Sequence, residues 1–158
     1  MNRDYDLSKI FSDDIQHILS KLQKLQKTIN EVRSVQIGTT PRKKVFQNRG
    51  MSLYRYQSPE YSGLPILLVY SLVNRPQIAD LQSDRSLVKQ LLAAGYEVYL
   101  IEWGDPIQSE EELSLEDYIL DYLGSVVNFL VYSHKCRAVH LIGLCQGGTF
   151  ATCYASLN

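Results

Sequence analysis

The stretch Ala138-Val139-His140-Leu141-Ile142-Gly143-Leu144-Cys145-Gln146-Gly147-Gly148 decides how the 158-residue chain is organised. An apolar run ends in the pattern Gly-x-Cys-x-Gly, and Thr149 and Phe150 begin the small-residue segment that follows. This pattern is typical of a strand, a sharp turn and a helix, with a nucleophilic side chain held at the turn. Glycines at 143 and 147 leave room where the backbone folds tightly. We therefore predict an elbow of residues 143–148 with Cys145 as its nucleophile.

The composition and net charge of the sequence are typical of a globular protein. The formal net charge of -1 favours neither a nucleic-acid partner nor an acidic tail. We expect no signal peptide behind residues 1–6, and no apolar run approaches the ~18 residues of a membrane span. The three cysteines form no CxxC pair, so we expect free thiols. These features predict a cytoplasmic protein with no metal site.

Residues 11–32 carry apolar side chains at alternating steps of four and three, which predicts an amphipathic helix with a heptad seam. The seam consists of Phe11, Ile15, Ile18, Leu22, Leu25, Ile29 and Val32. Ser12 with the two acidic residues after it predicts the helix start. We assign residues 1–37 to this helical segment. A helix packed on its own domain and a helix paired with a partner helix both fit so narrow a stripe.

Residues 38–158 alternate between strand and helix patterns, which predicts a doubly wound α/β sheet with right-handed crossovers. We read 38–44 as a linker. A hairpin of 45–47 and 51–56 is expected next, and then buried strands at 66–70, 97–101 and 138–142. Helices are expected at 80–94 and 114–130, the second opened by a Ser114–Asp117 capping box.

The chemistry expected at Cys145 follows from its place at the end of a strand. Ligands of such sheets bind beyond the carboxyl ends of the strands, where loop 72–74 and Cys145 should both lie. Backbone N–H groups and the dipole of the following helix favour a thiolate there. The N–H of Gln146 provides one half of an oxyanion hole, and loop 72–74 provides the other. A thiolate suits a thioester substrate, since acyl transfer from sulfur to sulfur is nearly balanced in energy. The alternative is a buried structural thiol.

A nucleophile of this kind needs a base, which this fold usually supplies after the nucleophile, as Asp or Glu and then His. Residues 146–158 contain no Asp, Glu or His. His17 lies on the N-terminal helix. His134 precedes the third strand and lies near its amino end, away from Cys145. His140 lies on that strand, where we expect its ring under a helix. We assign none of them as the base. We therefore expect the front part of a larger enzyme, inactive alone, with a bare apolar edge on the third strand.

Five motifs, in this order, resemble those of polyhydroxyalkanoate synthases, most closely the two-component class III enzymes and the related class IV. They are YSLVNRP at 70–76, DLQSDRSL at 80–87, VYLIEWGDP at 98–106, LEDY at 115–118 and GLCQGG at 143–148. The likeness covers residues 40–158, which identifies the chain as the N-terminal portion of a catalytic subunit.

The resemblance implies an α/β-hydrolase core in residues 38–158 and an acyltransferase activity. The family polymerises (R)-3-hydroxyacyl-CoA, typically 3-hydroxybutyryl-CoA, and releases CoA. Its cysteine at the position of Cys145 carries the acyl group or growing polyester chain, and N–H groups matching Gln146 and Val73 form the oxyanion hole. Its His and Asp match nothing in this sequence. No cofactor is implied, because the CoA thioester is the substrate. A location at polymer granules and a helical second subunit, which could contact the heptad seam, are also implied.

Asp80, Asp84 and Arg85 lie in one of these motifs. Helix capping and i,i+4 pairing account for such residues without catalysis, so we expect structural roles.

Two other hypotheses remain open at this point. A cysteine hydrolase on the same fold would cleave an ester or thioester with water. A non-catalytic chain would only bind a synthase partner or a granule. Formation of polymer would identify the synthase and free hydroxy acid the hydrolase, whereas an inert Cys145 would favour binding alone.

Overall fold

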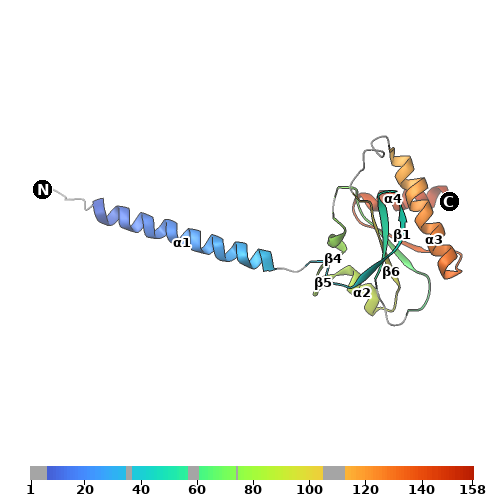
Figure 1. Cartoon of the computed structure of the whole chain (residues 1–158), viewed down its shortest axis with the longest axis horizontal. Coiled ribbons are helices and arrows are strands. Elements are labelled where there is room, and N and C mark those ends of the chain that lie inside the picture. Colours follow the sequence, from blue (N-terminus) through green and yellow to red (C-terminus); the bar gives the residue numbers. More distant parts are fainter. Residues whose placement is uncertain (1–6, 35–36, 57–60, 74, 105–112) are drawn as a thin grey trace. The chain divides into compact units, whose positions relative to one another are not determined.

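The computed structural model describes residues 7–34, 37–56, 61–73, 75–104 and 113–158. The chain divides into two units, Met1–Gln36 and Ile37–Asn158, and each is described by itself. The first contains one long helix, α1, from Leu7 to Ser34 (Figure 1). The predicted helix is confirmed, but Ser12 is wrong as its start, because the helix already begins one turn earlier.

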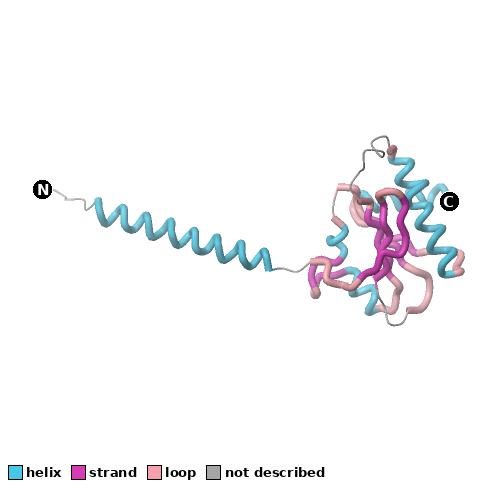
Figure 2. The backbone as a smooth tube through the Cα atoms, in the orientation of Figure 1, coloured by secondary structure: helices cyan, strands magenta, loops and turns pink. Residues whose placement is uncertain are grey.

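The second unit is built on a five-stranded sheet with the strand order β1-β2-β6-β3-β7. Figure 2 shows the strands of this unit in magenta. The strands are β1 Arg42–Asn48, β2 Met51–Tyr56, β3 Ile66–Val69, β6 Val98–Glu102 and β7 His140–Gly143. The hairpin β1–β2 joins β6 in antiparallel fashion, whereas β6, β3 and β7 are parallel. The predicted hairpin, the three parallel strands and the α/β class are confirmed, but only β3 and β6 are buried, and the burial predicted for the third strand, β7, is wrong. The predicted linker at 42–44 is wrong, since these residues begin β1.

The order of the parallel strands determines where the helices lie. The chain leaves β3 through α2 (Leu87–Ala93) to reach β6, and then passes through η3 (Asp117–Leu123) and α3 (Gly124–His134) to β7 on the other side of β3. Because such crossovers are right-handed, α2 and α3 cover opposite faces of the sheet. The strand between them, β3, is fully buried, as its continuous apolar run predicts.

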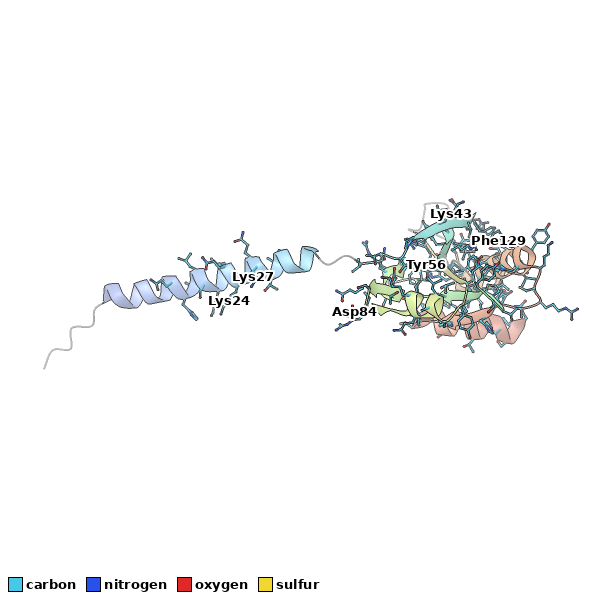
Figure 3. All side chains as sticks on the ribbon, turned by 90° about the horizontal axis from the view of Figure 1, so that it is seen from below. Lys24, Lys27, Lys43, Tyr56, Asp84 and Phe129 are labelled. Atoms are coloured by element: carbon cyan, nitrogen blue, oxygen red, sulfur yellow. The ribbon has the colours of Figure 1, made fainter. Side chains whose placement is uncertain are left out.

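Aromatic side chains attach the helices to the sheet on the α3 side. Figure 1 shows α3 alongside β1, where the rings of Phe46 and Phe129 stack at 4.9 Å (Phe129 is labelled in Figure 3). Farther along, the ring of Trp103 meets those of Tyr118 and Phe150 edge to face at 5.6 and 6.0 Å. The capping box that opens this segment is confirmed, because Ser114 Oγ accepts from the N–H of Asp117 at 3.2 Å and Asp117 Oδ2 accepts from the N–H of Ser114 at 2.7 Å.

Strand β7 lies at one edge of the sheet, as expected. Among the described residues no further strand pairs with it. Its outer side and α4 (Gln146–Leu157) border a groove of about 610 Å³ whose walls are mainly apolar or small. The lining residues are Leu141, Gly143, Gly148, Ala151, Thr152, Ala155 and Ser156.

The helix predicted at 80–94 is wrong in its first half. Asp80–Gln82 (β4) and Arg85–Ser86 (β5) form a small hairpin after the 3-10 turn η1 (Pro76–Ala79), and only α2 is helical. The reason is the buried carboxylate of Asp80. It accepts from the N–H and Oγ1 of Thr40 at 2.9 and 2.8 Å and from Ser86 Oγ at 2.5 Å. These bonds take the place of the helix-capping role that was expected of Asp80.

The Asp80 carboxylate should contribute measurably to stability. Burial raises its pKa, but the hydrogen bonds from Ser86 and Thr40 outweigh burial and lower the pKa below its usual value. An amide offers a single acceptor oxygen, so Asp80→Asn should reduce the free energy of unfolding by about 1–3 kcal/mol at neutral pH.

This contribution should depend on pH with a definite sign. The pKa of Asp80 is lower in the folded state than in the unfolded state, so its stabilisation is present above the unfolded value and is lost as pH falls through the folded one. In urea unfolding, the gap between wild type and Asp80→Asn should therefore shrink below about pH 4. Asp84→Asn, in the exposed turn of the same hairpin (Figure 3), is the matched control and should change little. A gap that is constant with pH would contradict this assignment.

Candidate functional site

Cys145 occupies the turn between β7 and α4. It is exposed and has φ 56° and ψ −127°, a backbone conformation that non-glycine residues rarely adopt. The N–H of Leu144 donates to the Val69 carbonyl at 2.8 Å, and that of Gly148 donates to the Cys145 carbonyl at 2.9 Å. These bonds fasten the turn to β3 on one side and start α4 on the other. The predicted strand, turn and helix are present, and Cys145 is not a buried thiol.

The two glycines of the motif allow this turn because backbone approaches them closely. A Cβ at Gly143 would lie 2.2 Å from the Cα of Gly148, and a Cβ at Gly147 would lie 2.1 Å from the Val69 carbonyl oxygen. Neither contact is possible for a real side chain. Gly147 thus lets the first turn of α4 rest directly on the end of β3.

The loop after β3 lies beside the turn. Trp103 Nε1 donates to the Tyr70 carbonyl at 2.9 Å, and the N–H of Leu72 donates to Oε1 of Gln146 at 3.1 Å. Val73 follows directly, with 87% of its side chain exposed. The structure therefore brings the segments of both predicted oxyanion donors, Gln146 and Val73, together at the carboxyl end of the sheet. Residue 74 of the predicted loop lies outside the described residues.

Within the described part of the chain, no backbone carbonyl accepts from the N–H of Gln146 or of Val73, the two predicted oxyanion donors. Gln146 is the first residue of α4, so its N–H has no acceptor within the helix. Both N–H groups can therefore donate to a ligand.

A cavity of about 320 Å³ opens beside this loop. Its lining is largely polar and comes from the carboxyl ends of β3 and β6: Tyr70, Leu72, Val73, Arg75, Pro76, Gln77, Glu102 and Gly104. Cys145 is not among them. The cavity therefore adjoins the loop that carries Val73 but does not reach the thiol.

The described histidines of this unit do not reach Cys145. His134 lies at the amino end of the sheet, where Nε2 is 2.8 Å from the Tyr99 hydroxyl and Nδ1 is 3.5 Å from a carboxylate oxygen of the buried Glu97. Arg55 pairs with the same carboxylate. His140 begins β7, so a rise of ~3.3 Å per residue places it about 10 Å before Gly143, where the strand ends and the turn with Cys145 begins. Its predicted place under a helix is wrong, since it is exposed at the sheet edge. His17 belongs to the other unit.

Two features of this unit were not predicted from the sequence, one at the amino end of the sheet and one beside Cys145. In the cluster of Glu97, Tyr99 and His134, the first directly precedes β6 and the second lies in it, but His134 comes from the end of α3, 35 residues after Tyr99, so no local pattern predicts the cluster. The side-chain bond of Gln146 joins positions 74 residues apart. The only sequence signal for this bond is a polar residue at the first position of a helix, and that signal is weak.

Comparison with known proteins gives the family. Residues 65–158 match the family model described as alpha/beta hydrolase fold. The chain belongs to the alpha/beta hydrolase fold family. Solved structures agree: a protein described as a lipase from Sulfolobus solfataricus has a TM-score of 0.58 at 18% identity, covering 73% of this chain and 39% of that one. Epoxide Hydrolase A from Mycobacterium thermoresistibile gives 0.50 at 18% identity, covering 74% of this chain and 35% of that one. At such identities the likeness shows the fold alone.

Curated relatives within this fold confirm the resemblance to polyhydroxyalkanoate synthases. Poly(3-hydroxyalkanoate) polymerase subunit PhaC of Synechocystis is 46% identical over 147 residues, which cover 92% of this chain and 38% of that protein. The same subunit of Thiocystis violacea is 42% identical over 144 residues, covering 88% of this chain and 40% of the relative. The chain thus spans about two fifths of the length of the relatives it matches.

Within the described residues, no three His, Cys, Asp or Glu side chains are grouped so as to hold a metal ion. No helix in that part of the chain is long and apolar enough to cross a membrane.

Proposed function

We propose that this chain carries the nucleophile of a polyhydroxyalkanoate synthase and that Cys145 accepts the acyl group of an (R)-3-hydroxyacyl-CoA. The observation that carries the proposal is the exposed thiol at φ 56°, in a chain 40–46% identical to three PhaC subunits. A non-glycine residue at such an angle costs about 1–3 kcal/mol, and strain of this kind clusters where it positions a functional group. The thiol faces solvent, where a thioester can approach.

The proposed step is an acyl transfer between two sulfur atoms. The Cys145 thiolate attacks the thioester carbonyl, a bond from Sγ to carbon forms, and the carbonyl oxygen becomes an oxyanion. The N–H groups of Gln146 and Val73 donate to this oxyanion. When the carbonyl re-forms, the bond to the CoA sulfur breaks and CoA leaves as a thiolate that takes up a proton. The product is a hydroxyacyl thioester on Cys145 and free CoA.

Turnover needs a base, and no histidine of the described part of this unit lies beside Cys145. To lengthen the polymer, the hydroxyl of one 3-hydroxyacyl group must lose its proton and attack the thioester of another. Among the histidines, His134 is engaged with Glu97 and Tyr99, and His140 is distant along β7. We therefore propose that the base belongs to the part of the PhaC relatives that the match does not cover, and that this chain performs only the acylation step.

Incubation of the chain with 3-hydroxybutyryl-CoA separates the three candidate functions. The proposed synthase role predicts one CoA released per chain and a mass increase of one hydroxybutyryl group. Release of CoA beyond one equivalent, with free 3-hydroxybutyrate, would instead show a hydrolase. No CoA release from a chain whose thiols still react with iodoacetamide would favour a binding role and contradict the proposal.

A helical second subunit is the partner that we propose for α1, and a polymer granule is the proposed location of the assembly. The relatives are named subunits of a polymerase. The seam residues whose side chains are described, Ile18, Leu22, Leu25 and Ile29, are 41–56% exposed. Figure 3 shows Lys24 and Lys27 extending from the same helix. An exposed apolar stripe with heptad spacing suits pairing with another helix.

Charges placed in the seam should weaken this pairing. We expect Ile18→Asp with Leu25→Asp to abolish co-purification with the second subunit of a two-component synthase. Each buried carboxylate would lose its hydration without gaining a partner. Gln16→Asp with Gln23→Asp adds the same charge at the same spacing on the opposite face, and this control should co-purify normally. If both double variants co-purify equally well with the second subunit, the seam of α1 does not bind that subunit and serves its own chain.

A further inference from the structure

The side chain of Gln146 makes a bond that the proposed acyl transfer does not itself require. Its Oε1 accepts from the backbone N–H of Leu72 at 3.1 Å. This bond crosses from the first residue of α4 to the loop after β3, two segments 74 residues apart in the chain. Both segments carry a proposed oxyanion donor, and the bond lies between them.

We infer that the Gln146 side chain is a positioning residue, which sets the N–H of Val73 at a fixed place relative to the N–H of Gln146. The inference rests on the proposed function, in which those two N–H groups form the oxyanion hole. Gln146 would thus act twice, as a donor through its backbone and as a positioning residue through its amide oxygen.

The surroundings of Val73 explain why a tether is needed. Its side chain is 87% exposed, so packing does little to hold it. The loop is fixed at Tyr70 by the bond from Trp103, and β3 ends one residue earlier, at Val69. Among the described residues, the hydrogen bond at Leu72 is the last one that holds the loop before Val73.

The geometry of an oxyanion hole makes small displacements costly. Its donors work at about 2.7–3.1 Å from the developing oxyanion, and loss of one donor costs about 10²–10³-fold in rate. A donor that remains but moves freely should cost less, so loss of the tether is expected to slow acylation about tenfold. Alkylation of the same thiol has no oxyanion and should not change.

The test compares two reactions of Cys145 in Gln146→Met, which keeps the side-chain length and removes the acceptor. Acylation by 3-hydroxybutyryl-CoA should fall about tenfold relative to wild type, while alkylation by iodoacetamide stays within about twofold. Thr149→Met, an exposed position on the same helix, is the matched control and should leave the ratio of the two rates unchanged. An unchanged ratio in Gln146→Met, or an equal fall in both rates, would overturn the inference.

Amide hydrogen exchange tests the tether without any activity. The Leu72 amide should be protected in wild type, should exchange faster in Gln146→Met, and should regain protection in Gln146→Glu, whose carboxylate still accepts. The Glu variant is used only here, because its charge would oppose an oxyanion. A Leu72 amide that exchanges equally in all three proteins would overturn the inference. If wild type were not acylated, the proposed function would fail, and exchange would still decide whether Gln146 holds the loop.

Discussion

Gly147→Ala should destabilise the unit Ile37–Asn158 by about 3–5 kcal/mol, because backbone atoms occupy the place of the new methyl group. A Cβ there would meet the Val69 carbonyl oxygen at 2.1 Å, its carbon at 2.5 Å and the Tyr70 Cα at 2.8 Å. No side chain can rotate away to relieve these contacts, so α4 must move off the end of β3. Urea unfolding followed by the fluorescence of Trp103, the single tryptophan, measures the loss.

Gly148→Ala is the matched control for this prediction. It lies next in the same helix, but the nearest atom to its Cβ would be the Gly143 carbonyl oxygen at 3.6 Å, an ordinary contact. Alanine is favoured over glycine within helices by about 1 kcal/mol, so this variant should be as stable as wild type or slightly more stable. Equal unfolding midpoints for the two variants would contradict the close packing of α4 on β3.

Cys145→Ala should reduce acylation by 3-hydroxybutyryl-CoA about 10³-fold or more, to the background of the assay, because it removes the only atom proposed to accept the acyl group. Cys136→Ala and Cys153→Ala are the natural controls, since both thiols are free and only partly exposed. Each control should be acylated at the wild-type rate. The measurement is intact mass after exposure to the thioester.

Two results would contradict this second prediction. Acylation that survives in Cys145→Ala would place the nucleophile elsewhere. Acylation that disappears in Cys153→Ala would show that the acyl acceptor is the Cys153 thiol within α4 and not the Cys145 thiol at the elbow. Trp103 fluorescence should show that Cys145→Ala is folded, so that a lack of acylation is not caused by a loss of structure.

The elbow was predictable from sequence because its determinants are local. An apolar run, two glycines and a residue between them specify a strand, a tight turn and a helix within a dozen positions. The structure places Cys145 at positive φ in that turn. The Ser114–Asp117 capping box was predictable for the same reason, since both of its hydrogen bonds join residues three apart.

The errors lie where distant residues decide. Asp80 fits a helix start locally, but bonds from Thr40, forty residues away, and from Ser86 hold it in a hairpin. His140 was expected under a helix because its strand is apolar, yet β7 is the edge strand and its first residue is exposed. The Gln146–Leu72 bond could not be predicted either, because its donor is a backbone N–H, which every residue except proline has, so the identity of residue 72 does not indicate the bond.

The central claim is that the elbow presents Cys145 for acylation by a hydroxyacyl thioester. The most direct test is to digest the chain after exposure to 3-hydroxybutyryl-CoA and to locate the acyl group by peptide mass spectrometry. The account predicts a hydroxybutyryl thioester on Cys145, with Cys136 and Cys153 unmodified. An acyl group spread over the three cysteines in proportion to their exposure, or absent from Cys145, would contradict it.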